Sequence, residues 1–382
     1  MEIKRMAMAM ATARGDRLSD LPESILLHIL SMLPDRKQVV RTSMLSTRWR
    51  FLWMSVPVSL YFEFPEEEEM GRPHQQILDF VTSTHRELHY WRSCQKIRDF
   101  TILFNSYQKK FIADVDLWVS FATKLANVEE FTLCLLYGPT YQFPQFAYKN
   151  KSLRSLDLGN CTLNPSANVN WRGLVSLSLR HINLMEGVME KVLSGCPNLE
   201  CLELENFSGF HSLEISSVKM RKLIITNYRT NVYDVWLEIL APHIQNLQLF
   251  WLHRGICLRN VASLVTAVIN FDFDLDIKHG YQMQRKLSGC LKELLHSVAH
   301  VKNLELSPWC IECLSVLELE GWQPPPSSWK FLQLSTALKQ WDFPGICRFL
   351  PSSLDLETLV INGCTYQSRV SSPWTFMFMT SC

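Results

Sequence analysis

A short apolar phrase that returns along most of the chain constrains the fold more than any other feature. The phrase is an apolar residue, two others, a second apolar residue, one other and a third apolar residue. Because it recurs at intervals of 20 to 37 residues, each copy predicts one coil of a repeat architecture. The copies begin at Ile97, Val128, Leu153, Leu174, Leu199, Met220, Ile244, Leu264, Val301, Trp329 and Leu356.

The alternation inside the phrase is typical of a short β-strand with one buried face. Each coil buries its apolar edge only against its neighbours, which predicts a curved α/β solenoid with parallel strands on the concave face. Residues 186–193 have helical spacing before Gly195 and Pro197, which predicts a convex-side helix with a glycine stop. Residues 283–300 predict an extra helix, and residues 310–320 fit the phrase although their position favours the helical side.

Composition excludes several classes of protein. The 382 residues include 55 Leu but only 14 Gly, which argues against a collagen-like or linker-dominated chain. A formal net charge of +1 gives no basic footprint, so no nucleic-acid partner is expected. No apolar run is long enough to span a membrane, and no secretory signal precedes the 12 cysteines. We therefore expect reduced thiols, no membrane partner, and a location in the cytoplasm, the nucleus or both.

Large apolar residues are dense ahead of the repeats, within residues 17–57. Pro22 suits the first position of a helix that extends to Leu33 and that Pro34 ends. A second helix is expected around Val39, Val40 and Leu45, and a third through Trp49, Leu52 and Trp53. Three short helices bury little surface alone, so this module predicts a docking face.

The N-terminal module resembles the F-box. The resemblance is carried by Leu21-Pro22, by the helix from Glu23 to Leu33, and by the segment from Ser46 to Arg50 with Trp53 after it. In that family the helices pack on a Skp-type adaptor, which connects them to a cullin-based ubiquitin ligase. The alternative is a helical cap on the first coil of the solenoid. The resemblance implies that ten residues form or support the adaptor-binding face: Leu21, Pro22, Ile25, Leu26, Ile29, Leu30, Val40, Leu45, Ser46 and Trp49.

Two copies of the phrase extend into the full leucine-rich-repeat motif. Cys161 and Cys364 occupy its Asn/Cys position and are expected to pack inward rather than to bind a ligand. The combination of an F-box with irregular repeats, including SGCPNLE and SLDLETLVING, is similar to the large F-box/leucine-rich-repeat family of plants.

These features predict a domain order. We expect a disordered N-terminus over 1–16, the F-box over 17–57, and a linker with a connecting helix over 58–94. The irregular leucine-rich-repeat solenoid follows over 95–364, and an atypical tail over 365–382. The Glu66–Glu69 run is expected to be a solvated loop of the linker.

Motifs for catalysis or cofactor binding are scarce. The chain has no phosphate-binding glycine loop and no nucleophile elbow, so neither a cofactor nor an enzymatic role is expected. His296, His300, Cys310 and Cys313 have a spacing that could supply four zinc ligands. Against a zinc site, the segment lacks a knuckle glycine, and Cys313 starts an apolar run that a coil needs.

The resemblance implies a substrate receptor of a Skp-Cullin-F-box ubiquitin ligase whose repeats bind a protein target. One alternative is a hormone-like co-receptor, in which a small molecule completes the target site. That alternative predicts converging arginines such as Arg154, Arg180 or Arg221. Another is an interaction scaffold outside any ligase.

Overall fold

The computed structural model describes residues 18, 20–33, 36–56, 58–64, 74–92, 97–105, 107–228, 236–250, 255–271 and 280–363. The chain divides into two compact units, residues 1–199 and 200–382. The expected disordered N-terminus, the Glu66–Glu69 run, Cys364 and the tail over 365–382 lie outside the described residues. None of the described helices is long and apolar enough to cross a membrane.

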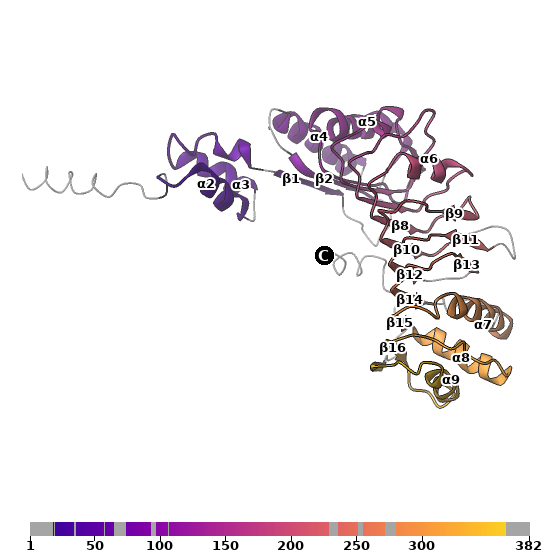
Figure 1. The fold of residues 1–382 in the computed structure, drawn as a ribbon. Coiled ribbons are helices and arrows are strands. Elements are labelled where there is room, and N and C mark those ends of the chain that lie inside the picture. Colours follow the sequence, from indigo (N-terminus) through magenta and orange to yellow (C-terminus); the bar gives the residue numbers. More distant parts are fainter. Residues whose placement is uncertain are drawn as a thin grey trace, which may run out of the picture. The chain divides into compact units, whose positions relative to one another are not determined.

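The first unit contains the N-terminal module and a parallel sheet of strand order β1-β2-β3-β5-β7 (Figure 1). Helices α4 and α5 pack against this sheet, where Phe80 and Trp118 meet Phe104. The module elements are α2 (Glu23–Ser31), α3 (Arg36–Arg41), η1 (Thr42–Met44) and η2 (Leu52–Ser55). The other elements are β1 (Val58–Phe64), α4 (His74–Trp91), β2 (Ile97–Phe104), η3 (Lys109–Phe111), α5 (Ile112–Ser120), η4 (Phe121–Leu125), β3 (Glu130–Cys134), β4 (Tyr141–Gln142), η5 (Gln145–Tyr148), β5 (Ser155–Gly159), β6 (Cys161–Thr162), β7 (Ser176–Arg180) and α6 (Val188–Ser194).

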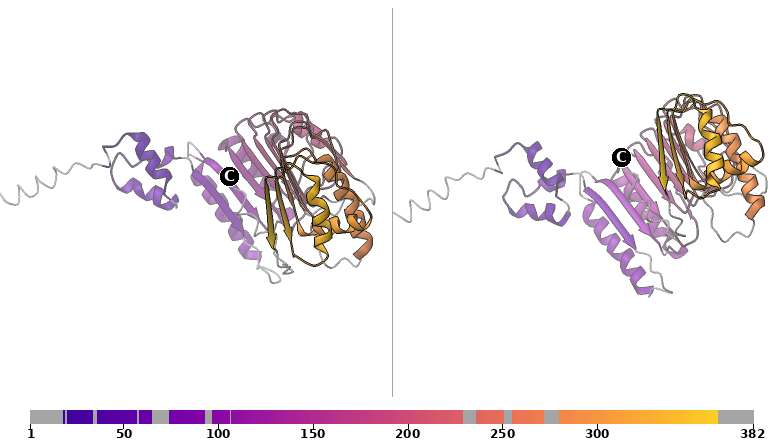
Figure 2. Two further views of the ribbon diagram at one scale, coloured as in Figure 1. Left: turned by 60° about the horizontal axis from the view of Figure 1, so that its bottom comes forward. Right: turned by 90° about the horizontal axis from the view of Figure 1, so that it is seen from below.

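The second unit continues the same coil design with the strand order β8-β10-β12-β14-β15-β16-β17. These strands lie on one side, and α7, α8 and α9 lie on the other (Figures 1 and 2). A second, three-stranded parallel sheet has the order β13-β11-β9. The elements are β8 (Cys201–Glu205), β9 (Ser212–Glu214), β10 (Lys222–Thr226), β11 (Leu237–Leu240), β12 (Asn246–Phe250), β13 (Ile256–Arg259), β14 (Thr266–Asn270), α7 (Gly280–Ser297), β15 (Asn303–Leu306), α8 (Pro308–Leu319), β16 (Phe331–Thr336), α9 (Asp342–Phe349), η6 (Leu350–Ser352) and β17 (Thr358–Gly363).

All eleven copies of the apolar phrase form strands of these parallel sheets, as predicted. In β5, Leu156 and Leu158 are fully buried while Asp157 between them stays partly exposed. The register keeps equivalent positions side by side, since Leu156 is paired with Phe131 and with Leu177. Each leucine therefore stacks on its equivalent in the next coil, which is why the phrase must recur.

The length of a coil decides what lies opposite its strand in the second unit. The short intervals beginning at Leu199, Met220 and Ile244, of 20 to 24 residues, hold the strands β9, β11 and β13 there. The longer intervals, of 27 to 37 residues, hold α7, α8 and α9. A helix advances only about 1.5 Å per residue, so only the longer intervals have enough chain for one. Residues 310–320 lie in α8, on the helical side that their position favoured.

The expected linker over 58–94 is wrong at its start, because residues 58–64 are a strand. Strand β1 alternates between buried and exposed residues and pairs in parallel with β2. Its apolar residues Val58, Leu60, Phe62 and Phe64 follow the period of two. Val58 pairs with Ile97, the first residue of the next copy, but it lies one residue closer to Leu60 than the repeated phrase requires. The connecting helix is present as α4.

Two smaller expectations also differ from the structure. The predicted third helix of the module is only a turn around Trp49 followed by the 3₁₀ helix η2. The predicted glycine stop after α6 is present, but Gly195 has φ −82°, which any residue can adopt. A side chain there would come within 2.6 Å of Val169, so close packing between coils explains the glycine.

Candidate functional site

The N-terminal module has its own small core. Leu26 and Leu30 of α2 are completely buried and pack with Trp49 of the following turn. The Arg48 guanidinium donates a hydrogen bond of 2.7 Å to the Leu21 carbonyl oxygen and ties that turn to the start of α2. The core is completed by Leu52 and Val56, with Leu21, Leu27, Leu33 and Val39 partly buried around it.

The structure divides the ten predicted adaptor-binding residues into two groups. Leu26, Leu30 and Trp49 are at most 3% exposed, so they hold the module together and have no surface to offer a partner. The other seven lie at the surface, and Ile25 and Leu45 among them are 44% and 65% exposed. The partly or fully exposed group is Leu21, Pro22, Ile25, Ile29, Val40, Leu45 and Ser46.

The module exposes further large apolar side chains that sequence reasoning missed. They are Leu18, Met32, Met44 and Phe51, each more than half exposed. The signal available in the sequence was the excess of apolar residues over what a core of this size can bury. Such a surface is unusual on a solvated module and is typical of a protein-binding face.

Trp53, the last residue of the family motif, contacts the rest of the first unit. Its ring stacks on Tyr90 of α4, with centroids 6.4 Å apart and an interplanar angle of 7°. It meets Trp91 edge-on at 6.0 Å. Trp53 therefore joins the module to α4.

The strands of the first unit present a row of polar side chains, four hydroxyls and one carboxylate, which we call the hydroxyl row. The residue between the second and third apolar residues of each phrase points away from the core, so the row could be identified from the sequence. Neighbouring strands are about 4.8 Å apart, which sets the spacing along the row. Burial, together with a hydrogen bond to Glu63, raises the pKa of Tyr61 to about 12, so its hydroxyl stays protonated. The row consists of Tyr61, Thr101, Thr132, Asp157 and Ser178.

The equivalent row of the second unit has a different chemistry. It mixes amides, carboxylates and aliphatic side chains and contains none of the hydroxyls that predominate in the first unit's row. The Gln333 amide lies 3.4 Å from the Glu305 carboxylate, so neighbouring members of the row contact one another. The row consists of Glu203, Ile224, Gln248, Val268, Glu305, Gln333 and Val360. The strand faces of the two units therefore carry different side chains.

A loop of the second unit, residues 337–341, presents apolar side chains to solvent. Leu338 is 51% exposed and Trp341 is 61% exposed, and Phe343 at the start of α9 is 50% exposed. Leu338 has φ +54°, a left-handed conformation that leucine rarely adopts. The loop is therefore a candidate contact surface held in an unusual shape.

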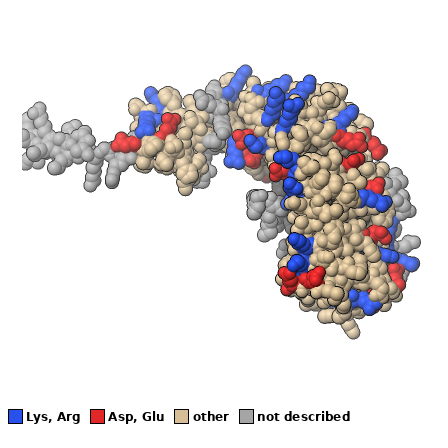
Figure 3. Space-filling view, viewed as in Figure 1, with Lys and Arg blue, Asp and Glu red and all other residues tan. Residues whose placement is uncertain are grey.

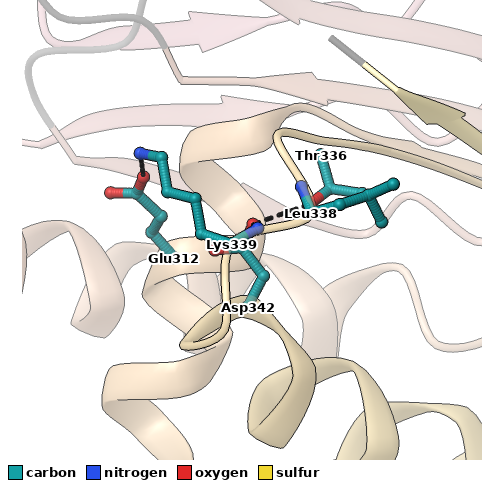
Figure 4. Close-up of polar contacts among 5 residues, drawn as sticks. All are labelled: Glu312, Thr336, Leu338, Lys339 and Asp342. Atoms are coloured by element: carbon teal, nitrogen blue, oxygen red, sulfur yellow. Dashed lines mark hydrogen bonds and ion pairs between the residues drawn. The ribbon is translucent and has the colours of Figure 1, made fainter. Parts of the chain in front are cut away.

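Asp342 holds this loop in place (Figure 4). Its side chain is 2% exposed, and Oδ2 accepts hydrogen bonds from the Thr336 hydroxyl at 2.8 Å and the Lys339 N–H at 3.0 Å. The Thr336 hydroxyl oxygen accepts the Leu338 N–H, and the Lys339 ammonium group lies 3.0 Å from Glu312 of α8. The left-handed residue is thus enclosed by side-chain hydrogen bonds.

We expect Asp342→Ala to lower the free energy of unfolding of the second unit by about 2 kcal/mol. The substitution leaves a buried hydroxyl and a partly buried N–H without their acceptor, and such losses cost about 1–3 kcal/mol. Urea denaturation would measure the change. The matched control is Asp355→Ala, because Asp355 is exposed and its loss should change stability by less than about 0.5 kcal/mol. Equal effects of the two substitutions would contradict this role of Asp342.

The arginines that a ligand-completed site would need do not converge in the first unit. Arg154 precedes β5 and Arg180 ends β7, and the register aligns Ser155 with Ser176 and Gly159 with Arg180. The two arginines are therefore separated by roughly 15 Å along the strands. Arg180 also pairs with Asp157, its Nε lying 3.0 Å from that carboxylate. Arg221 belongs to the second unit.

The four possible zinc ligands have other partners in the fold. The His300 Nε2 atom lies 2.9 Å from the Val261 carbonyl oxygen, and the His296 ring contacts Trp322. Cys310 and Cys313 are buried in α8. Within the described residues, no three His, Cys, Asp or Glu side chains are placed to hold a metal ion.

The buried thiols are poor nucleophiles. Burial raises the pKa of Cys196 to about 12 and that of Cys290 to about 11. It also raises the pKa of Cys161, Cys310 and Cys313. These thiols therefore stay protonated at neutral pH and lack the thiolate that a catalytic cysteine needs. Cys161 is fully buried, which confirms the inward packing predicted for it.

Comparison with known proteins connects both parts of the chain to one family. A model described as the At1g61320/AtMIF1 LRR domain matches residues 91–372, and an F-box domain model matches residues 18–60. The chain is 32% identical to the Arabidopsis thaliana F-box/LRR-repeat protein At3g03360, over 91% of this chain and 70% of that protein. It is 29% identical to the Arabidopsis thaliana putative F-box protein At1g49610, over 96% of this chain and 89% of that protein.

Proposed function

The chain belongs to the plant F-box/leucine-rich-repeat family, and from that membership we propose that it is the substrate-recognition subunit of a Skp-Cullin-F-box ubiquitin ligase. The F-box would bind a Skp-type adaptor and through it a cullin, and the strand faces and loops of the repeats would bind a protein target. The observation that carries the proposal is the surplus of exposed apolar side chains on a module that already has its own core.

In this proposal the seven surface residues of the predicted ten contact the adaptor directly. Leu26, Leu30 and Trp49 act indirectly, because they maintain the positions of α2 and of the turn that carries Leu45. Exposed apolar residues contribute free energy to binding when a partner covers them, at about 25 cal/mol per Å² of buried apolar surface.

The mechanism is positioning rather than chemistry. A receptor that binds a target and an adaptor together raises the effective concentration of target lysines beside the ubiquitin-carrying enzyme. The buried, protonated thiols described above fit a chain that leaves the transfer of ubiquitin to its partners. The cytoplasm or the nucleus, where such ligases act, is the proposed location.

The test is affinity purification of the chain from plant cells with and without a proteasome inhibitor. We expect a Skp-type adaptor and a cullin in both samples, and a target enriched several-fold only when degradation is blocked. A variant that cannot bind the adaptor should enrich the same target without the inhibitor, because the bound target is no longer ubiquitinated. Adaptor binding without cullin would favour the scaffold, and target binding that requires an added small molecule would favour the co-receptor.

A further inference from the structure

Five exposed basic residues lie along one border of the first unit, where the chain enters its strands. We call them the basic strip: Lys124, Lys149, Lys151, Arg154 and Arg172. None of the five forms an ion pair with any residue in the described part of the chain. Figure 3 shows Lys and Arg side chains gathering over this unit in the region of α5.

The strip is continuous although its members are up to 48 residues apart in the sequence. The Asn150 amide donates a hydrogen bond of 2.7 Å to the Thr123 carbonyl oxygen, which brings Lys149 and Lys151 beside Lys124. A side chain at Gly173 would come within 2.6 Å of the Lys151 carbonyl oxygen, so the turn that carries Arg172 lies against Lys151. The stacking of successive coils therefore brings the basic side chains of the strip together.

The backbone beneath the strip is fixed by hydrogen bonds from two asparagine side chains. The Asn150 side chain is 3% exposed, and its Oδ1 accepts the N–H groups of Ser152 at 2.9 Å and Leu153 at 2.8 Å. The Asn198 amide donates to the Arg172 carbonyl oxygen at 2.8 Å. A rigid backbone beneath the strip limits the conformational entropy that is lost when the strip binds a partner.

The gathering of five basic residues on this unit suggests an anionic partner. The whole chain has a formal net charge of +1, with 38 basic and 37 acidic residues, yet the strip holds five bases together. An acid, Glu129, lies beside the strip, because its carbonyl oxygen accepts the Arg154 N–H at 2.7 Å. Five neighbouring positive charges create a local field that attracts an anionic chain.

The ligand that fits best is an acidic polypeptide segment rather than a nucleic acid. Single-stranded nucleic acids are bound by basic grooves with aromatic side chains on which bases stack. The aromatic ring beside the strip is that of Phe146, and the Lys124 ammonium group lies over it at 3.9 Å. That contact already occupies one face of the ring, and carboxylates need only the cations.

We propose that the basic strip binds an acidic segment of the target protein, which rests on the proposed function of the chain as a substrate receptor. Lys151 and Arg172 lie against one another on adjacent coils and contribute most to this binding. The hydroxyl row of the same unit would then contact other parts of the target.

A labelled oligoglutamate peptide tests the strip in the full chain by fluorescence anisotropy. We expect the double variant Lys151→Glu/Arg172→Glu to bind the peptide about tenfold more weakly than the wild type, since it replaces two attractions by two repulsions. The difference should shrink as salt is raised, because exposed charges are screened. The matched single variants are Lys151→Glu and Lys292→Glu, both at exposed lysines without ion pairs, and only the first should weaken binding.

Adaptor co-purification of the same variants separates this inference from the proposed function. If the wild type binds the adaptor but Lys151→Glu and Lys292→Glu bind oligoglutamate equally, the strip proposal is overturned and the receptor role stands. If the wild type fails to bind the adaptor, the receptor role is overturned instead. Tighter binding of oligothymidylate than of oligoglutamate would overturn the assignment to a protein segment.

Discussion

Replacing both Ile25 and Leu45 by Asp should weaken binding of the chain to a Skp-type adaptor by at least about 100-fold, or about 2.7 kcal/mol. Both side chains are large, apolar and exposed, at 44% and 65%, on a module that is already folded around other residues. Each should contribute about 1.5–3 kcal/mol when an adaptor covers it. A carboxylate buried without a partner at the same place adds a further cost.

The fold of the module should survive these substitutions, because neither side chain belongs to its core. The matched control is Ser24→Asp, which adds the same charge to an exposed position of α2, about 100° along the helix from Ile25. Asp is favourable in the first turn of a helix, so this variant should fold and bind normally. Co-expression with the adaptor followed by calorimetry measures the difference, and circular dichroism confirms folding. Retained binding by Ile25→Asp/Leu45→Asp would exclude the F-box assignment of this surface.

Trp49 is unsuitable for that experiment although it is one of the ten predicted residues. It is 3% exposed and packs with Leu26 and Leu30, so Trp49→Ala would disrupt the module itself. Loss of the adaptor would then follow from unfolding and would say nothing about direct contact.

Trp171→Ala should lower the free energy of unfolding of the first unit by about 4 kcal/mol. Trp171 is fully buried, stacks on Tyr148 with ring centroids 5.5 Å apart, and donates a hydrogen bond of 2.8 Å to the Ala147 carbonyl oxygen. Truncating a buried tryptophan leaves a large cavity and costs about 3–5 kcal/mol. Here it also leaves the carbonyl oxygen without its donor.

One further variant separates packing from the hydrogen bond, and a second is a control at an exposed position. Trp171→Phe keeps part of the stack and should recover more than half of the loss. Trp341→Ala removes the same side chain from a position that is 61% exposed, and it should cost less than about 1 kcal/mol. Hydrogen exchange of residues 141–180 in native conditions would localise the effect to the coils around Trp171. Similar protection in Trp171→Ala and the wild type would contradict this account of the core.

The repeat architecture was predictable because its information is local. The alternation in Leu156-Asp157-Leu158 states which residues face the core, and the recurrence of the phrase states that coils stack. Interval lengths even indicate where helices occur, since only the longer ones accommodate α7, α8 and α9. The strand β1 was missed because its first apolar residue, Val58, lies one residue too close to Leu60 for the phrase, so only its alternation marked it.

The candidate adaptor surface was predictable as a segment but not residue by residue. Ile25, Leu26, Ile29 and Leu30 are alike in sequence, and helical spacing cannot decide which of two adjacent faces turns inward. That choice depends on Trp49, which packs against Leu26 and Leu30 and leaves Ile25 exposed.

By itself the sequence determined the order of the two parts, the parallel strands and the inward-facing leucines, because each depends on residues close together in the chain. Tertiary structure alone decided which apolar residues of the module stay at the surface. It also decided that bases as distant as Lys124 and Arg172 form one strip, since only the stacking of coils brings their backbones together. The binding surfaces of a solenoid combine residues from several coils. A single sequence carries little information about which residues so far apart in the chain lie side by side.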